Sequence, residues 1–190
     1  SPQQPTWIEQ IEGTLVLADI SGFTRLSERL AEIGKEGAER LTEIINSYFS
    51  RMLDMARSLD GHNVKFGGDA LLLLFMGNDH ALRAVATSLA MIRATQSFKA
   101  VIIGKERIRL NMSAGVHSGT FWSASAGISG VRMQHFLLGR EASYAAKAEG
   151  KSESGEVVVT PATRQLLGDR CETEHCGDFF RVLRLTTRIA

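Results

Sequence analysis

The sequence lacks the features that place a chain in a membrane or in a disulfide-stabilised fold. No apolar run approaches the roughly 20 residues that a membrane-spanning helix needs, and no signal peptide is visible at its start. The two cysteines, Cys171 and Cys176, are too few for a disulfide framework. These absences favour a soluble protein in a reducing, cytoplasmic setting.

An excess of one charge is also missing, since 22 Lys and Arg against 21 Asp and Glu leave a net charge of +1. Such a balance gives no support for a nucleic acid or a membrane surface as a partner recognised through bulk charge. What is present is an ordinary apolar content of 44% in 190 residues, enough for the core of one domain. Because the chain begins SPQQP without Met, we expect a domain excised from a longer multidomain protein. Residues 1–12 would then be a loose lead-in and residues 13–190 the domain itself.

The order of apolar patterns predicts an α+β domain. Its beginning reads β-α-β-β-α-β, which is typical of ferredoxin-like folds with a mostly antiparallel sheet and helices packed on one face. The expected elements are a strand at 14–18, helices over 21–59 with a break near Gly34, a hairpin at 63–75, a helix at 79–98, a strand-turn-strand unit at 107–125, a strand at 131–139, a helix at 141–150, a strand at 156–160, a short helix from Pro161 and a last strand at 179–185.

Two aspartates stand where two neighbouring strands of such a fold end. Asp19 closes the apolar stretch TLVLAD, and Asp69 lies in the Gly-Gly-Asp turn of the hairpin. If the first strand lies beside the hairpin, the two carboxylates meet and repel each other unless a cation joins them. Oxygen ligands favour Mg²⁺ or Mn²⁺ in that role. Taken alone, an Asp at the position of Asp19 is more often a helix N-cap, and a Gly-Gly-Asp like that of Asp69 is more often an ordinary hairpin turn.

The residues around both aspartates suit a phosphate group. In ISGFT, residues 20–24, Gly22 permits a close backbone approach, and the helix that follows points its N-terminal N–H groups at the same place. Gly67 and Gly68 leave room beside Asp69. The combination predicts a nucleoside triphosphate held by two metal ions, which can activate an attacking oxygen and stabilise a leaving one.

The segments LADISGFT and KFGGDALLLLF resemble the two metal motifs of the class III nucleotidyl cyclases, the family of adenylyl and guanylyl cyclases. The resemblance runs from about Thr14 to about Thr160 and is closest to the first catalytic domain of soluble-type adenylyl cyclases. It implies the class III cyclase fold, in which Asp19, Asp69 and the Ile20 carbonyl bind two Mg²⁺ ions, with Mn²⁺ as an alternative. The 3′-hydroxyl of ATP would attack its own α-phosphorus, releasing pyrophosphate and closing the 3′,5′ ring.

The same resemblance implies which residues hold the substrate. Backbone around Gly22, Phe23 and Thr24 would bind the triphosphate, with Gly68 beside it. Lys65 stands at the position that reads the purine, where lysine suits adenine because it donates to a ring nitrogen. Without the resemblance, Lys65 reads as an ordinary strand lysine facing water.

The second half of the family's site departs from its pattern in this chain. In the family these residues come from a partner domain and follow a glycine as G-x-x-x-N-x-x-x-R on a helix. Here Gly139 fits, but Ser143 stands in place of Asn and Lys147 in place of Arg. Phe136 falls at the upstream purine-contact position, and lysine lacks the forked guanidinium of arginine. We therefore expect the chain to supply the metal-binding half of a site shared with a second cyclase domain, either another copy or a downstream domain.

Two other functions stay open at this point. A catalytically inactive pseudo-cyclase would act as a nucleotide sensor or dimerisation module, which the altered half-site favours and the two intact aspartates oppose. A diguanylate cyclase also carries Gly-Gly-Asp/Glu on a hairpin, but it continues with Glu-Phe where this chain has Ala70-Leu71.

A separate pattern near the end of the chain concerns zinc. Cys171, His175 and Cys176 are three possible ligands within six residues, with no fourth nearby, and this is a weak signal for a structural zinc site.

Overall fold

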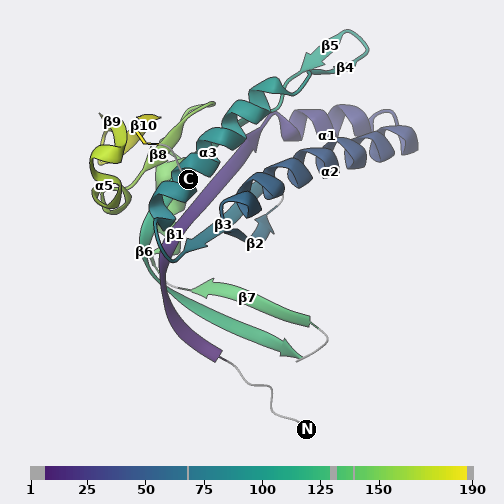
Figure 1. Cartoon of the computed structure of the whole chain (residues 1–190). Helices are drawn as coiled ribbons and strands as arrows, with labels where there is room; N and C mark the ends of the chain where they lie inside the picture. The colour runs from purple at the N-terminus through teal and green to yellow at the C-terminus, as the bar shows by residue number, and fades with distance from the viewer. Residues whose placement is uncertain (1–6, 68, 129–131, 139, 188–190) are drawn as a thin grey trace.

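The computed structural model describes residues 7–67, 69–128, 132–138 and 140–187, which form the expected α+β fold (Figure 1). The strands are β1 Trp7–Ser21, β2 Gly61–Gly67, β3 Ala70–Met76, β4 Val101–Ile103, β5 Glu106–Ile108, β6 Asn111–Ile128, β7 Arg132–Leu138, β8 Val157–Val159, β9 Cys171–Cys176 and β10 Phe179–Leu185. The helices are α1 Phe23–Ala31, α2 Lys35–Ser58, α3 His80–Ser97, α4 Ala142–Glu149 and α5 Pro161–Leu167, followed by a 3-10 turn at Gly168–Arg170.

One large sheet organises the molecule. Its strands follow the order β2-β3-β1-β6-β8-β10-β9, and β7 pairs with the outer part of β6. The neighbours pair antiparallel except β6 and β8, which are parallel. The first four strands of that order have the ferredoxin-like arrangement, so the predicted fold class is confirmed. The β4–β5 hairpin is a separate two-stranded unit that projects beyond α3 (Figure 1).

The two faces of the sheet are covered by different helices. Val16 and Ala18 of β1 point into the main core, where they meet buried side chains of α2 and α3. Leu15 points to the opposite face and packs with Ala145 of α4. The expectation that helices pack on one face of the sheet therefore holds for α2 and α3, which lie side by side in Figure 1. It is wrong for α4, which packs on the opposite face.

The first strand is longer than predicted. Residues 7–12 were expected in a loose lead-in, but they continue β1 and pair with residues 120–125 of β6. This end of the strand carries exposed polar residues, among them Glu9 and Glu12, so it lacks the apolar alternation by which a strand is recognised in sequence. No helix in the described part of the chain has the length and apolarity to cross a membrane.

The predicted strand-turn-strand unit at 107–125 is also corrected. Residues 111–128 form one uninterrupted strand, β6, and its first two glycines, Gly115 and Gly119, mark close contacts rather than a turn. A Cβ added at Gly115 would lie 2.1 Å from the backbone nitrogen of Glu149, because α4 packs directly on the strand there. Strand β9 had no predicted counterpart. The break near Gly34, the 63–75 hairpin and the helix that opens with Pro161 are confirmed.

Candidate functional site

The two predicted aspartates lie at the same end of the sheet. Asp19 is the last β1 residue paired with β3, directly opposite Ala70, and Asp69 immediately precedes Ala70 in the hairpin turn. Burial raises the pKa of the Asp19 carboxyl, the charge of Asp69 raises it further, and a hydrogen bond with the Ile20 backbone acts in the opposite direction. The register thus brings together two carboxylates that lie far apart in the sequence.

This pair fits the chemistry of a hard divalent cation. A partly buried carboxylate beside a second anion is destabilised in its charged form, and a bound cation removes that penalty. Within the described residues, no group of three or more His, Cys, Asp or Glu side chains is arranged to hold a metal ion. Magnesium needs no such group, because it commonly uses one or two carboxylates and completes its shell with water and substrate phosphate.

The start of α1 is built for a close approach of backbone. Gly22 occupies the N-cap position with φ of 89°, in the left-handed region that favours glycine. A Cβ there would lie 2.5 Å from the Arg109 carbonyl oxygen, so no other residue fits. No side chain caps the helix, and no acidic residue lies in its first turn. The N–H groups of Phe23 and Thr24 therefore lie at a helix N-terminus that suits an anion.

Two predicted substrate residues fall partly or wholly outside the described structure. The backbone of Lys65 pairs with Leu72 next to an irregularity in the β2–β3 register, but its side chain lies outside the described part, and so does all of Gly68. The proposed contact of Lys65 with a purine therefore stays a prediction. The Phe23 side chain packs against the main core, which leaves only its backbone for a ligand.

Helix α4 carries the two residues predicted to replace the family's Asn and Arg. The Ser143 hydroxyl donates to the Arg140 carbonyl oxygen at 2.7 Å, and the Lys147 ammonium lies 4.7 Å from the centroid of the Tyr144 ring. No hydrogen bond or ion pair within the described residues joins Ser143 or Lys147 to Asp19. Phe136 pairs through its backbone with Ala124 in the β6–β7 hairpin.

A third carboxylate near Asp19 was missed in the sequence. Glu149, the last residue of α4, accepts a hydrogen bond from Ser113 at 2.9 Å, and Ser113 is directly opposite Asp19 in the β1–β6 register. Burial raises the pKa of Glu149, the Ser113 bond lowers it, and the charge of Asp19 raises it further. The sequence feature that could have revealed Glu149 is an acidic residue in the last turn of a helix, where the helix dipole disfavours negative charge.

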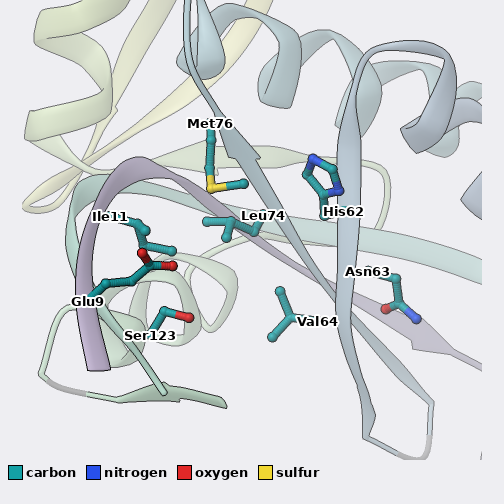
Figure 2. A pocket seen from close by; sticks show the side chains of 8 residues that line it. All are labelled: Glu9, Ile11, His62, Asn63, Val64, Leu74, Met76 and Ser123. Carbon is teal, nitrogen blue, oxygen red and sulfur yellow. The ribbon is translucent and has the colours of Figure 1, made fainter. Parts of the chain in front are cut away.

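An apolar pocket of about 360 Å³ opens on the α4 face of the sheet. Figure 2 shows its lining, in which Ile11 of β1, Val64 of β2 and Leu74 of β3 supply the apolar surface. These three side chains belong to the cluster that includes Ala145 of α4. The lining residues are Glu9, Ile11, His62, Asn63, Val64, Leu74, Met76 and Ser123.

The weak zinc pattern does not form a ligand cluster. Cys171 is buried, and burial raises the pKa of its thiol. Cys176 contacts the Lys151 carbonyl oxygen at 3.8 Å, and the His175 ring packs 4.6 Å from the Phe180 ring centroid. The three side chains have different neighbours, and within the described residues they form no metal-binding group.

Comparison with known proteins gives a family and a set of relatives. The family described as the adenylate and guanylate cyclase catalytic domain matches residues 8–181. Adenylate cyclase type 10 from Oryctolagus cuniculus is 28% identical over 176 residues, covering 87% of this chain and 10% of that protein. Guanylate cyclase soluble subunit alpha-2 from Homo sapiens is 26% identical over 155 residues, covering 81% of this chain and 20% of that protein. This chain thus spans only a small part of the curated relatives it matches.

Solved structures show the same fold at lower sequence identity. The adenylyl cyclase CyaB from P. aeruginosa has a TM-score of 0.76 at 23% identity, over 97% of this chain and 100% of that chain. The non-canonical dimeric guanylyl cyclase domain of the RhoGC fusion protein from Blastocladiella emersonii has a TM-score of 0.79 at 21% identity, over 96% of this chain and 100% of that chain.

Proposed function

Because this chain belongs to the adenylate and guanylate cyclase catalytic domain family, we propose that it acts as an adenylyl cyclase domain that converts ATP to 3′,5′-cyclic AMP and pyrophosphate. The observation that carries the proposal is the β1–β3 register, which sets Asp19 beside Asp69 at the open N-terminus of α1. That constellation has acidic oxygens for a cation and backbone N–H groups for a phosphate within one small region.

In this proposal the chain's own residues bind and orient the triphosphate. Asp19, Asp69 and the Ile20 carbonyl would hold two Mg²⁺ ions, or Mn²⁺ in their place. Bound there, the ions supply activation of the attacking oxygen and charge neutralisation at the leaving one. The backbone of residues 22–24 would receive the phosphates, and the left-handed Gly22 gives the chain room to approach them. A phosphate held at a helix N-terminus is also favoured by the helix dipole.

Lys65 and the adenylate cyclases among the relatives support adenine as the base. Lysine donates to the acceptor nitrogen that adenine presents, and the adenylate cyclases type 10 from four mammals are 26–28% identical to this chain. Guanylate cyclases are also among the relatives, so a direct comparison of substrates is needed. We expect turnover of ATP with Mg²⁺ to exceed that of GTP, and Lys65→Glu to reduce the preference. Equal turnover of both nucleotides by the wild-type chain would contradict adenine specificity.

A second cyclase domain would complete the site. The altered positions Ser143 and Lys147 support a partner that provides the family's Asn and Arg, and the apolar pocket on the α4 face offers a surface for that partner. A downstream domain of a longer parent chain could provide that Asn and Arg, whereas a second copy of this chain would present Ser143 and Lys147 in their place.

A second candidate function is supported by the surroundings of Ser143 and Lys147. The serine hydroxyl is already hydrogen-bonded to its own helix start, and the lysine ammonium already lies over an aromatic ring. A chain with these contacts would bind nucleotide without turning it over, as a nucleotide-sensing or dimerisation module.

Restoring the family pattern separates the two candidates. The variant Ser143→Asn/Lys147→Arg is expected to raise ATP turnover of the isolated domain, since one electrostatic contact to a transition state is worth roughly 10²- to 10³-fold in rate. Nucleotide binding without turnover, both in that variant and after addition of candidate partner domains, would favour the sensor.

A further inference from the structure

A network of side-chain hydrogen bonds, buried in its middle and partly buried at both ends, connects α3 to α4 through the sheet. At one end, the hydroxyl of Thr14 in β1 lies 2.6 Å from His80 Nδ1, at the first residue of α3. At the other end, His117 Nε2 of β6 lies 2.8 Å from the Glu141 carboxylate, at the N-cap of α4. The links between them are Thr14–Ser118 at 2.7 Å, Ser118–Thr163 at 3.0 Å, Thr163–Thr160 at 3.2 Å and Thr160–His117 Nδ1 at 2.9 Å.

The Glu141 carboxylate, at one end of this hydrogen-bond network, determines which ring nitrogen of His117 carries the hydrogen. An ionised carboxylate only accepts hydrogen bonds, so His117 Nε2–H must donate to Glu141. In the neutral ring the other nitrogen, Nδ1, then accepts from the Thr160 hydroxyl. His117 is only 5% exposed and Thr160 only 2%, and buried polar groups of this kind are costly when they lose their partners. The network therefore selects the Nε2–H tautomer.

Glu141 has no other evident role at its position. Glutamate is not among the residues that favour the N-cap, and its side chain makes no capping hydrogen bond to α4. The sheet leaves space for the pair, since a Cβ added at Gly119 would lie 3.0 Å from Glu141 Oε2 and 3.1 Å from His117 Nε2. The His117 ring, the Glu141 carboxylate and the backbone of Gly119 thus meet at the start of α4.

The same histidine also contacts the residue that supports Lys147. The His117 ring lies 5.0 Å from the Tyr144 ring, centroid to centroid, and the Lys147 ammonium lies over the other ring of that pair, at 4.7 Å. His117 therefore acts on α4 twice, through the carboxylate that precedes the helix and through the aromatic ring beneath its lysine.

From these contacts we propose that His117 and Glu141 are positioning residues that fix α4, and with it Ser143 and Lys147, relative to the sheet. The hydroxyls of Thr160, Thr163, Ser118 and Thr14 hold His117 in the tautomer that this role needs. The value of the arrangement for catalysis rests on the proposed function acting in a homodimer, in which α4 of one copy would face the nucleotide held by the other. The position of α4 itself does not, and it is measurable without any activity.

Nuclear magnetic resonance of the ¹⁵N-labelled domain tests the positioning directly. We expect the ring nitrogens of His117 to report the Nε2–H tautomer, and Glu141→Ala to shift the backbone amide signals of residues 143–149. Ser118→Ala should weaken the tautomer preference, whereas Ser88→Ala, which removes an equally buried hydroxyl that bonds only within α3, should leave it unchanged. An Nδ1–H tautomer in the wild type, or unmoved α4 signals in Glu141→Ala, would overturn the proposal.

Steady-state kinetics supply a second test, because lost positioning and a general loss of stability change kcat and KM differently. We expect Glu141→Ala to lower kcat for ATP by roughly 10²-fold, the cost of a small misplacement of a catalytic group, with KM little changed. Glu141→Gln, which keeps an acceptor oxygen, should retain part of the activity. A rise in KM at constant kcat would contradict positioning. A wild-type chain that has the expected tautomer but no ATP turnover would instead count against the proposed function alone.

Discussion

At the scale of a single residue, the pKa of the Asp19 carboxyl group reflects the groups that surround it. Both burial and the charge of Asp69 raise its pKa, so the folded protein without a bound cation disfavours the ionised form. A structural N-cap would be stabilised as an anion at a helix start, and Asp19 is not. A cation bound beside Asp19 would remove this penalty on its ionised form.

Replacement of Asp19 by asparagine is therefore expected to stabilise the metal-free domain. The folded pKa lies above the unfolded value of 3.8, so the carboxyl group stabilises the fold below pH 3.8, and this contribution is lost as pH rises through the folded pKa. Thermal unfolding at neutral pH should show a higher Tm for Asp19→Asn than for the wild type, with the difference vanishing in acid. Asp54→Asn, on exposed α2 beside Arg57, is the control and should not raise Tm. A lower Tm for Asp19→Asn would contradict this reasoning.

Tyr48 gives a second prediction that depends on burial. Burial raises its pKa to about 12, although the hydrogen bond with Thr95 lowers it somewhat. Because the folded value exceeds the ordinary 10.0, stability is lost as pH rises from about 10 toward 12. We expect ultraviolet titration to show one of the two tyrosines ionising late, and Tyr48→Phe to remove that late step. Two tyrosines that both ionise near the ordinary pKa would disprove the assignment.

At the scale of elements, α4 is held against the sheet by contacts at its middle and at both ends. It lies directly on β6 at Gly115, it is joined to the sheet by Glu141–His117 at one end, and Glu149–Ser113 joins it at the other. Its last residue thereby comes near Asp19. The end of the sheet that carries Asp19 and the helix that carries Ser143 and Lys147 are thus parts of one packed unit.

The close contact at Gly115 predicts a large effect from one methyl group. In Gly115→Ala the new Cβ would meet backbone atoms of α4 at 2.1 and 2.2 Å, which a flexible side chain cannot relieve. Denaturant unfolding should show a loss of about 1–3 kcal/mol or more, as for other overpacked sites. Gly150→Ala, whose Cβ would have ordinary contacts of 3.5 Å or more, should be nearly neutral. Equal stability of the two variants would show that α4 does not depend on this contact.

The sequence predicted those candidate site residues that can be recognised from their immediate neighbours along the chain. Asp19 follows an apolar strand and precedes a glycine and a helix, and Asp69 lies in a Gly-Gly-Asp turn, so both could be placed without knowing the rest of the fold. Glu149 and the His117–Glu141 pair were not predicted, because they depend on how α4 packs on β6. The glycine that permits that packing, Gly115, looks in sequence like a turn residue.

At the scale of the whole molecule, the pocket on the α4 face is the surface through which a second domain is expected to dock. Burial of apolar side chains such as Ile11 and Val64 against a partner would be favourable, and the charged Glu9 and the polar Asn63 lie in the same lining. In the family's shared-site arrangement, such a partner would also bring its own helix to the nucleotide.

We expect the domain to self-associate through this pocket. Val64→Asp should lower the average mass in sedimentation equilibrium, because a charge buried against a partner is costly. Ile102→Asp is the control, since Ile102 is 63% exposed on the β4–β5 hairpin, away from the pocket. If both variants sediment as the wild type does, the pocket is not a contact between copies.

The most direct measurement is calorimetric titration of an ATP analogue that cannot cyclise, with and without Mg²⁺, into the wild-type chain, Asp19→Asn, Asp69→Asn and the double variant. We expect binding by the wild type to require Mg²⁺, each single variant to weaken it by roughly tenfold or more, and the double variant to lose little beyond that, since residues that share one ion are not additive. Binding of equal strength in the wild type and the double variant would show that Asp19 and Asp69 do not hold the metal-bound triphosphate.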